Sequence, residues 1–240
     1  MVPRYIKQST TSIKKVYNRL FNDRCIFCLE NSIETVCNQC VSAFPSLLVQ
    51  CPRCAEPNHH GEVCGYCIKS RPAFDQVLCP YVYSGQISQL LHAYKQKPKS
   101  KGGGALLAGL LNILNDFEFD LVVPIPYHWR RLMQRGHNPV RELSHAVAQA
   151  TNTPLLDGLV RETSQHSQQG LDRQQRLRNL HGAFVIHPKL DPALLSGKHV
   201  LLVDDVVTTG ATCNSASQTL KQAGATSITI ACLARTPFKQ

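Results

Sequence analysis

Apolar runs alternate with amphipathic stretches along the last two thirds of the chain. The runs predicted to be strands are 77–83, 121–125, 155–160, 183–186, 200–203 and 227–233, and the helical stretches lie near 86–95, 104–116, 139–151 and 211–223. This alternation predicts an α/β domain with a mostly parallel sheet covered by helices. Runs that are apolar throughout, such as HVLLV, fit strands buried on both faces. Ligands of such sheets bind beyond the carboxyl ends of the strands.

The first 22 residues are basic and contain no acidic side chain. Apolar positions within them have helical spacing: Ile13, Val16, Tyr17, Leu20 and Phe21. We predict a basic amphipathic helix over residues 1–24 that packs on the following domain, although this composition is also typical of a transit peptide. No apolar stretch approaches the roughly 18 residues of a membrane span, and the start lacks a secretory signal. We therefore expect a cytoplasmic protein without membrane insertion.

Eight of the 11 cysteines form four C-x-x-C pairs. They are Cys25/Cys28, Cys37/Cys40, Cys51/Cys54 and Cys64/Cys67. Each pair places two sulfurs on one side of a tight turn, and two pairs complete a tetrahedral zinc site with Zn–S distances of ~2.3 Å. Disulfides would need an oxidising compartment, and four regularly spaced pairs do not favour a redox role. We predict a double zinc ribbon over residues 25–70 with two structural Zn²⁺ ions.

The order of the pairs favours two sites built from neighbours, because each ion then closes a short loop, but an interleaved arrangement stays open. The ribbon contains few large apolar residues, so the metal is expected to supply much of its folding free energy. Cys79, Cys213 and Cys232 lie in apolar surroundings and are predicted to be buried.

The net charge of +10 indicates a polyanionic partner, either nucleic acid or a phosphorylated small molecule. Between Cys25 and Cys67, however, one arginine stands against four glutamates. Because phosphate binding depends on Lys and Arg, structural support or protein docking suits this ribbon better than nucleic-acid binding. Basic residues cluster instead at 95, 97, 99 and 101, at 130, 131 and 135, and at 173, 176 and 178.

Residues 200–212, VLLVDDVVTTGAT, combine a strand, two carboxylates and a turn that opens a helix. A helix N-terminus after a glycine turn suits a phosphate, and the threonine hydroxyls add donors. Asp204 and Asp205 can accept hydrogen bonds from vicinal hydroxyls or hold Mg²⁺. A sugar 5-phosphate with free 2- and 3-hydroxyls satisfies both halves. The alternatives are a Walker B strand, although no G-x-x-x-x-G-K-[ST] is present, or a capped turn without a ligand.

This stretch resembles the phosphoribosyl pyrophosphate (PRPP) signature of type I phosphoribosyltransferases. The four C-x-x-C pairs, followed by VVPIPYHWRRLMQRGHNPVREL, RETSQHSQQGLDRQQRLRNLHGAF and the signature, resemble the ComF family of competence-related proteins. The resemblance covers residues 25–236. It implies a type I phosphoribosyltransferase fold over residues 71–240, preceded by the double zinc ribbon.

The resemblance also implies residue roles. Asp204 and Asp205 would hold the ribose hydroxyls of Mg²⁺-bound PRPP, and residues 161–181 would form a flexible segment that closes over the site. The 5-phosphate would be bound by Thr208, Thr209, Gly210, Ala211 and Thr212. The turn that contains Pro126, Tyr127 and His128 would approach pyrophosphate. Lys95 and Arg176 match positions of the family pattern and, with Arg130 and Arg131, would stabilise the departing pyrophosphate. The implied catalytic residues are Asp204, Asp205, Lys95 and Arg176.

The function implied is a Mg²⁺-dependent, PRPP-binding phosphoribosyltransferase-like protein that acts in the uptake or use of transforming DNA. Its acceptor stays open among a purine, a pyrimidine, an amine and single-stranded DNA. The alternative is a non-catalytic single-stranded-DNA-binding accessory protein that retains a PRPP pocket. Other DNA-uptake or recombination proteins are expected partners.

Overall fold

The structure is a computed structural model that describes residues 24–47, 49–96, 102–127, 129–161 and 183–238. The predicted N-terminal helix and nearly all of the predicted closing segment lie outside these ranges. Contacts divide the chain into two compact units, Met1–Phe44 and Pro45–Gln240. This boundary lies between the two groups of cysteines, and the predicted division into residues 1–24, 25–70 and 71–240 stays a prediction about folding units.

The described part of the first unit, residues 24–44, has a very small apolar interior. Its short helix α2 (Asn38–Ser42) follows Cys37, and the rings of Phe27 and Phe44 meet edge to face at 6.1 Å. Ile33 is 90% exposed, so even the apolar residues of this unit are only partly used for packing. Burial of this extent cannot hold a fold of this size together, and the unit needs another source of stability.

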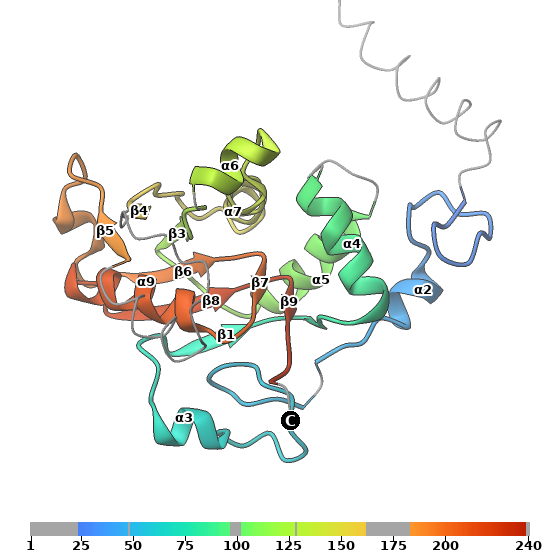
Figure 1. The fold of residues 1–240 in the computed structure, drawn as a ribbon, viewed down its shortest axis with the longest axis horizontal. Coiled ribbons are helices and arrows are strands. Elements are labelled where there is room, and N and C mark those ends of the chain that lie inside the picture. Colours follow the sequence, from blue (N-terminus) through green and yellow to red (C-terminus); the bar gives the residue numbers. More distant parts are fainter. Residues whose placement is uncertain (1–23, 48, 97–101, 128, 162–182, 239–240) are drawn as a thin grey trace, which may run out of the picture. The chain divides into compact units, whose positions relative to one another are not determined.

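The second unit is built on four parallel strands in the order β1 (Gln76–Leu78), β8 (Ser227–Ala231), β6 (His199–Val203) and β3 (Leu121–Pro124) (Figure 1). Three of them continue, in the same order, into a second parallel sheet: β2 (Tyr81–Val82), β9 (Ala234–Arg235) and β7 (Val206–Val207). Each of the three strands is interrupted for two residues between the sheets. On β6 and β7 the interrupting pair is Asp204–Asp205.

Four helices pack around these sheets, as the apolar periodicity predicts. They are α4 (Gly85–Gln96), α5 (Gly103–Leu114), α7 (Pro139–Ala150) and α9 (Ala211–Gln222). Strands β6 and β8 are buried at every position after the first, which confirms the prediction of strands covered on both faces. Cys79, Cys213 and Cys232 are buried as predicted. No helix in the described part of the chain is long and apolar enough to cross a bilayer.

The region between α7 and β6 differs from its prediction. Leu155 forms only a single bridge to Val122 of the main sheet. The chain then turns, and β4 (Leu159–Arg161) pairs antiparallel with β5 (Phe184–Ile186) in a separate small sheet. A Cβ on Gly158 would lie 2.9 Å from the end of the Leu190 side chain, so the chain passes close to Leu190 at this point. Two further short helices were not predicted, α6 (Trp129–Arg135) and the 3₁₀ turn η1 (Pro192–Leu195).

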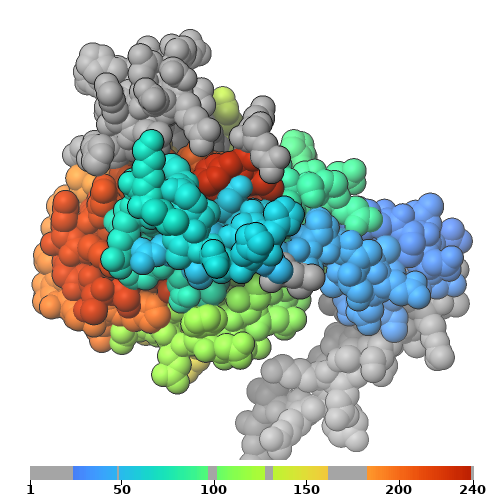
Figure 2. Space-filling model, turned by 90° about the horizontal axis from the view of Figure 1, so that it is seen from below, coloured from blue at the N-terminus to red at the C-terminus, as the bar shows by residue number. Residues whose placement is uncertain are grey.

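The second group of cysteines is part of the α/β unit. Its helix α3 (Gly65–Lys69) follows Cys64, and Cys51, Cys54 and Cys67 share one apolar core with the central strands. Figure 2 shows the teal segment that contains these residues lying against the orange and red C-terminal part of the chain. This segment is therefore anchored by apolar packing as well as by its cysteines.

Candidate functional site

Strand register brings two motifs to one edge of the sheet, and their residues Tyr127 and Asp205 are 78 positions apart in the sequence. Strands β3 and β6 are parallel with Pro124 opposite Val203, and the N–H of Ile125 donates to the carbonyl of Val203 at 2.9 Å. The turn with Pro126 and Tyr127 and the pair Asp204–Asp205 therefore leave the sheet at the same level. This is the carboxyl edge, where parallel sheets bind ligands.

The two aspartates occupy different environments. Asp205 is only 5% exposed, accepts the Tyr127 hydroxyl at 3.0 Å and forms an ion pair with Lys95 at 3.1 Å. Asp204 is half-buried, and its Oδ1 accepts the N–H of Asp205 at 2.8 Å. Three residues predicted from separate motifs thus meet in one network. Asp204 is the more accessible carboxylate, whereas Asp205 holds Lys95 and Tyr127.

Arg135, which the sequence places only in a basic cluster, extends this network. Its guanidinium donates to the Tyr127 hydroxyl at 2.7 Å and lies 5.5 Å from the centre of that ring. Burial, followed by the charge of Asp205, raises the pKa of Tyr127, so the phenol stays neutral and donates to Asp205. Arg135 is exposed and lies at the end of α6, an element that the sequence analysis missed.

The end of α4 is tied to the turn before α7, which places Lys95. The two ring nitrogens of His137 lie 3.1 Å and 2.9 Å from the backbone carbonyls of Lys95 and Arg135. The hydroxyl of Tyr94 donates to the carbonyl of Pro139 at 2.8 Å. His128 and Arg176 lie outside the described residues, as do the side chains of Arg130 and Arg131.

We call residues 208–212 the phosphate loop. Thr208 is exposed and the next four residues are half-buried. Gly210 adopts a left-handed conformation (φ 76°) and precedes α9, whose first turn begins at Ala211. The Thr209 hydroxyl accepts the N–H of Ala211 at 3.3 Å. A 12-residue helix that starts here directs unpaired N–H groups and its positive dipole end toward a bound anion.

A hollow of about 50 Å³ lies between α3 and the start of α9. Its walls include Tyr66, Ser70 and Phe74 on one side and Gly210 and Asn214 on the other. The Asn214 side chain accepts the N–H of Ala73 at 2.6 Å, which fixes the chain that leads out of the second cysteine group. The phosphate loop therefore has that segment as its neighbour.

Arg235 was not identified from the sequence. It lies on β9, is fully buried, and its guanidinium contacts the carbonyls of Val207, just before the phosphate loop, and of Thr208, the first residue of the loop. The available signal was a lone arginine directly after the apolar run 227–234.

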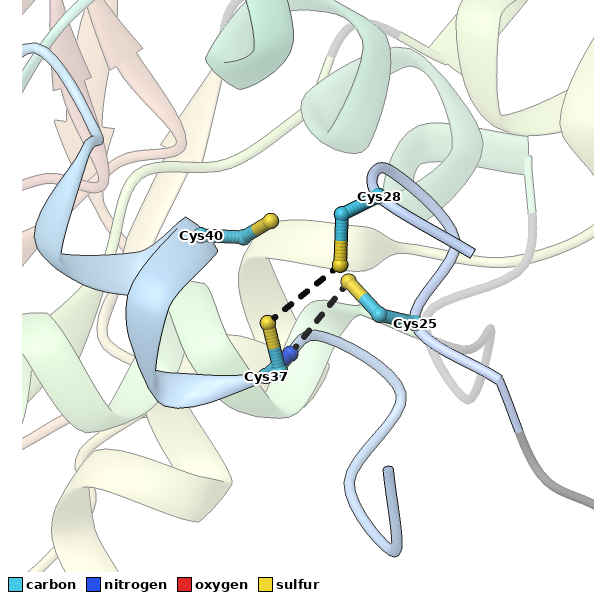
Figure 3. A group of neighbouring side chains, drawn as sticks. All are labelled: Cys25, Cys28, Cys37 and Cys40. Atoms are coloured by element: carbon cyan, nitrogen blue, oxygen red, sulfur yellow. Dashed lines mark hydrogen bonds between the residues drawn. The ribbon is translucent and has the colours of Figure 1, made fainter. Parts of the chain in front are cut away.

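The cysteines form two clusters of neighbouring pairs. We call Cys25, Cys28, Cys37 and Cys40 the first cluster (Figure 3) and Cys51, Cys54, Cys64 and Cys67 the second cluster. Within each cluster all four sulfurs lie within 4.8 Å of one another. One sulfur pair in each, Cys28–Cys37 and Cys54–Cys64, is 3.6 Å apart. This distance is close to the edge of about 3.8 Å expected for a tetrahedron of sulfurs ~2.3 Å from a zinc ion.

Both clusters use the same backbone turn. A left-handed residue follows the second cysteine of the first pair, Leu29 (φ 62°) in one cluster and Ala55 (φ 54°) in the other. In each cluster a backbone N–H also donates to the first sulfur, from Cys37 at 3.4 Å and from Cys64 at 3.3 Å. The repetition favours the sequential grouping of neighbouring pairs over the interleaved one.

The thiols of each cluster cannot all ionise without a cation. Backbone N–H groups of Cys28 and Cys37 lower the pKa of Cys25 to about 6, whereas burial and the neighbouring thiols raise that of Cys40 to about 12. In the second cluster, burial raises the pKa of Cys51, but N–H donors outweigh it and lower the value to about 7. Burial, with Cys51 and Cys64, raises that of Cys54 to about 12. Both clusters fit a tetrahedral cation such as zinc.

A phosphoribosyl transferase domain matches residues 139–240 of this chain. Together with the parallel sheet and the acid pair at its carboxyl edge, this match defines the α/β unit as a type I phosphoribosyltransferase fold, as predicted. The solved structure of a purine phosphoribosyltransferase from Pyrococcus horikoshii is a distant match, with 23% identity, a TM-score of 0.34 and coverage of 55% of this chain and 72% of that one.

Three named relatives match along most of the chain. Competence protein F of Haemophilus influenzae is 27% identical over 230 residues, which cover 90% of this chain and 98% of that protein. DNA utilization protein YhgH of Escherichia coli K12 is 29% identical over 210 residues, 84% of this chain and 90% of its own. Competence protein ComFC of Bacillus subtilis is 25% identical and covers 84% and 83%. Over most of its length the chain is thus similar to proteins named for competence and DNA utilization.

Proposed function

We propose that this protein binds PRPP together with Mg²⁺ and transfers its phosphoribosyl group to an acceptor. The observation that carries the proposal is the arrangement at one sheet edge: an accessible carboxylate, the phosphate loop at a helix N-terminus, and the cations Lys95 and Arg135 around Tyr127. A sugar 5-phosphate that also carries pyrophosphate has matching groups. Its hydroxyls would face the carboxylate, its 5-phosphate would face the N–H groups of the helix, and its pyrophosphate would face the two cations.

The residues divide the chemistry between them. Asp204 accepts hydrogen bonds from the vicinal hydroxyls, and the phosphate loop holds the 5-phosphate. When the bond between C1 and the pyrophosphate oxygen breaks, positive charge develops on the sugar and negative charge on the leaving group. The carboxylates stabilise the first, and Lys95 and Arg135 the second. Mg²⁺ bound with PRPP would add charge neutralisation at the pyrophosphate. We assign His128, Arg130 and Arg176 to the same pyrophosphate end.

Binding and turnover test this proposal separately. Calorimetric titration with PRPP is expected to show binding that weakens when Mg²⁺ is removed. Release of pyrophosphate is then measured with adenine, orotate, a primary amine and a single-stranded oligonucleotide as acceptors. Release that depends on one of them identifies the reaction, while binding without release leaves a PRPP sensor. No binding at millimolar PRPP contradicts the proposal.

We further propose that the first and second clusters each hold one structural Zn²⁺ ion. This assignment is supported by the sulfur separations and by the repeated turn. It is also supported by the thiol pKa values, which are lowered for one cysteine of a cluster and raised for its neighbours. The clusters contain only thiols and leave no open position for catalysis, which is typical of structural sites.

The cellular role we propose is in the uptake or use of transforming DNA in the cytoplasm, by analogy with relatives named for competence and DNA utilization. The net charge of +10 favours single-stranded DNA as a further ligand. Such binding is expected to weaken by roughly 10³–10⁵ between 50 and 200 mM salt if about 6–10 phosphates are contacted. A fluorescence titration at several salt concentrations measures this, and binding insensitive to salt contradicts it.

A further inference from the structure

Arg235 is a charged side chain with an exposed fraction of 0%. A guanidinium keeps its proton and carries five N–H donors, and a buried charge without partners is strongly destabilising. Its partners therefore indicate what the residue does. Besides the neighbouring carbonyl of Thr236 and the ring of Phe238, they come from two segments about 150 residues apart in the sequence, the turn of the second cluster and the start of the phosphate loop.

On one side, Arg235 is held by the second cluster. Its Nε donates to the carbonyl of Cys54 at 3.0 Å, and its guanidinium forms an ion pair with Glu56 at 2.8 Å. Glu56 is itself fixed in the cluster turn, because its carbonyl accepts the N–H of Cys51 at 2.8 Å. Its other carboxylate oxygen accepts the N–H of Phe238 at 2.8 Å. The position of the guanidinium thus depends on the geometry of this turn.

On the other side, Arg235 holds the phosphate loop. Its guanidinium donates to the carbonyl of Val207 at 3.2 Å and to the carbonyl of Thr208. A trans peptide holds its C=O and its N–H in opposite directions. When these two carbonyls point to Arg235, the N–H groups of Thr208 and Thr209 point away from it. The guanidinium therefore sets the direction of donors at the start of the loop.

We propose that Arg235 is a positioning residue for the phosphate loop, and that it makes the loop depend on the second cluster but not on the first. A metal ion at the second cluster would fix the Cys54 carbonyl and Glu56, which fix Arg235, which fixes the loop. The first cluster has the same chemistry but belongs to the other compact unit. The inference rests on the proposed function in one respect, namely that the loop binds the 5-phosphate of PRPP.

Glu56→Gln tests this link with little change of shape. Glu62→Gln is the matched control, since Glu62 lies in the same segment and is exposed. We expect Glu56→Gln to weaken PRPP and ribose 5-phosphate by about tenfold, because a slightly misdirected binding group loses much of its effect. Pyrophosphate alone should bind as before, since the Tyr127 and Lys95 network is unaffected. A general destabilisation of the protein would instead weaken the binding of pyrophosphate as well as that of the sugar phosphates.

The same comparison is made for the metal. Cys64→Ser in the second cluster and Cys40→Ser in the first are each expected to lower the zinc content from two ions per chain to one. Only Cys64→Ser should weaken ribose 5-phosphate. If Cys64→Ser does not fold, the Glu56→Gln comparison decides.

Amide hydrogen exchange of residues 206–212 gives a readout without ligand. We expect faster exchange in Glu56→Gln than in the wild type or Glu62→Gln. Equal exchange and equal sugar-phosphate affinity in the two glutamine variants would overturn the inference. If the wild type binds neither PRPP nor ribose 5-phosphate, the proposed function fails, and the exchange comparison alone decides whether Arg235 positions the loop.

Discussion

Replacement of both Asp204 and Asp205 by asparagine is expected to weaken PRPP binding by at least about a hundredfold while the protein stays folded. A hydrogen bond to a charged group contributes about 1.5–3 kcal/mol, which corresponds to a factor of roughly 10–150 in affinity. The amides keep the shape of the carboxylates but lose the charge that attracts the sugar hydroxyls. The Asp205→Asn substitution also removes the ion pair with Lys95. The Lys95 side chain is 23% exposed, so its ammonium group can be solvated by water instead. Calorimetry with PRPP measures the loss, and circular dichroism reports the fold.

Two variants separate the role of the carboxylates from other effects. Tyr127→Phe removes the hydrogen bond to Asp205 and the one from Arg135 but keeps both carboxylates, and it is expected to cost about tenfold or less. Asp157→Asn changes an exposed carboxylate paired with Arg141 and should leave PRPP binding unchanged. Wild-type affinity in the double asparagine variant would show that the acid pair does not bind the sugar.

Removal of zinc is expected to have the largest effect on stability. Elemental analysis of reduced protein should find two zinc ions per chain, one for each cluster. Structural zinc sites contribute apparent binding free energies of about 10–16 kcal/mol near pH 7, and this free energy is also folding free energy. A strong chelator should therefore unfold the first unit, whose apolar interior is very small, and lower the Tm of the second unit by roughly 10 °C or more. A zinc content near zero in freshly purified protein contradicts the assignment.

Zinc binding is also expected to release protons. The pKa values of Cys28 and Cys40 in the first cluster and of Cys54 and Cys67 in the second are raised, so these thiols are protonated at pH 7 without metal. Each ion should displace at least two protons, because only thiolates bind zinc. Acidification consequently favours metal loss. Calorimetry in buffers of different ionisation enthalpy counts the protons released.

Long-range pairing explains which parts of the fold could be predicted. The central strands and four helices are visible because burial on both faces, or on one helical face, leaves a periodic pattern. Strand β5 lies in a predicted run, but the antiparallel pairing of β4 with β5 in a separate sheet leaves no such pattern, and neither do the two-residue strands β7 and β9. Short segments are strands only where a partner lies beside them. Leu155 lies in an apolar run typical of a strand, yet it pairs with the main sheet only through a single bridge to Val122.

The sequence by itself determined the class of fold, the cysteine pairs of both clusters and the position of the acid pair at a strand end. Those features reside in local spacing: two sulfurs per turn, two carboxylates before a glycine turn, and apolar runs of strand length. Only the tertiary structure decided that Asp205 holds Lys95 and Tyr127 while Asp204 is half-buried, that Arg135 joins them, and that Arg235 connects the second cluster to the phosphate loop. Each of these contacts joins residues from separate elements. Their distances depend on strand order and register, which the spacing of residues along the chain does not contain.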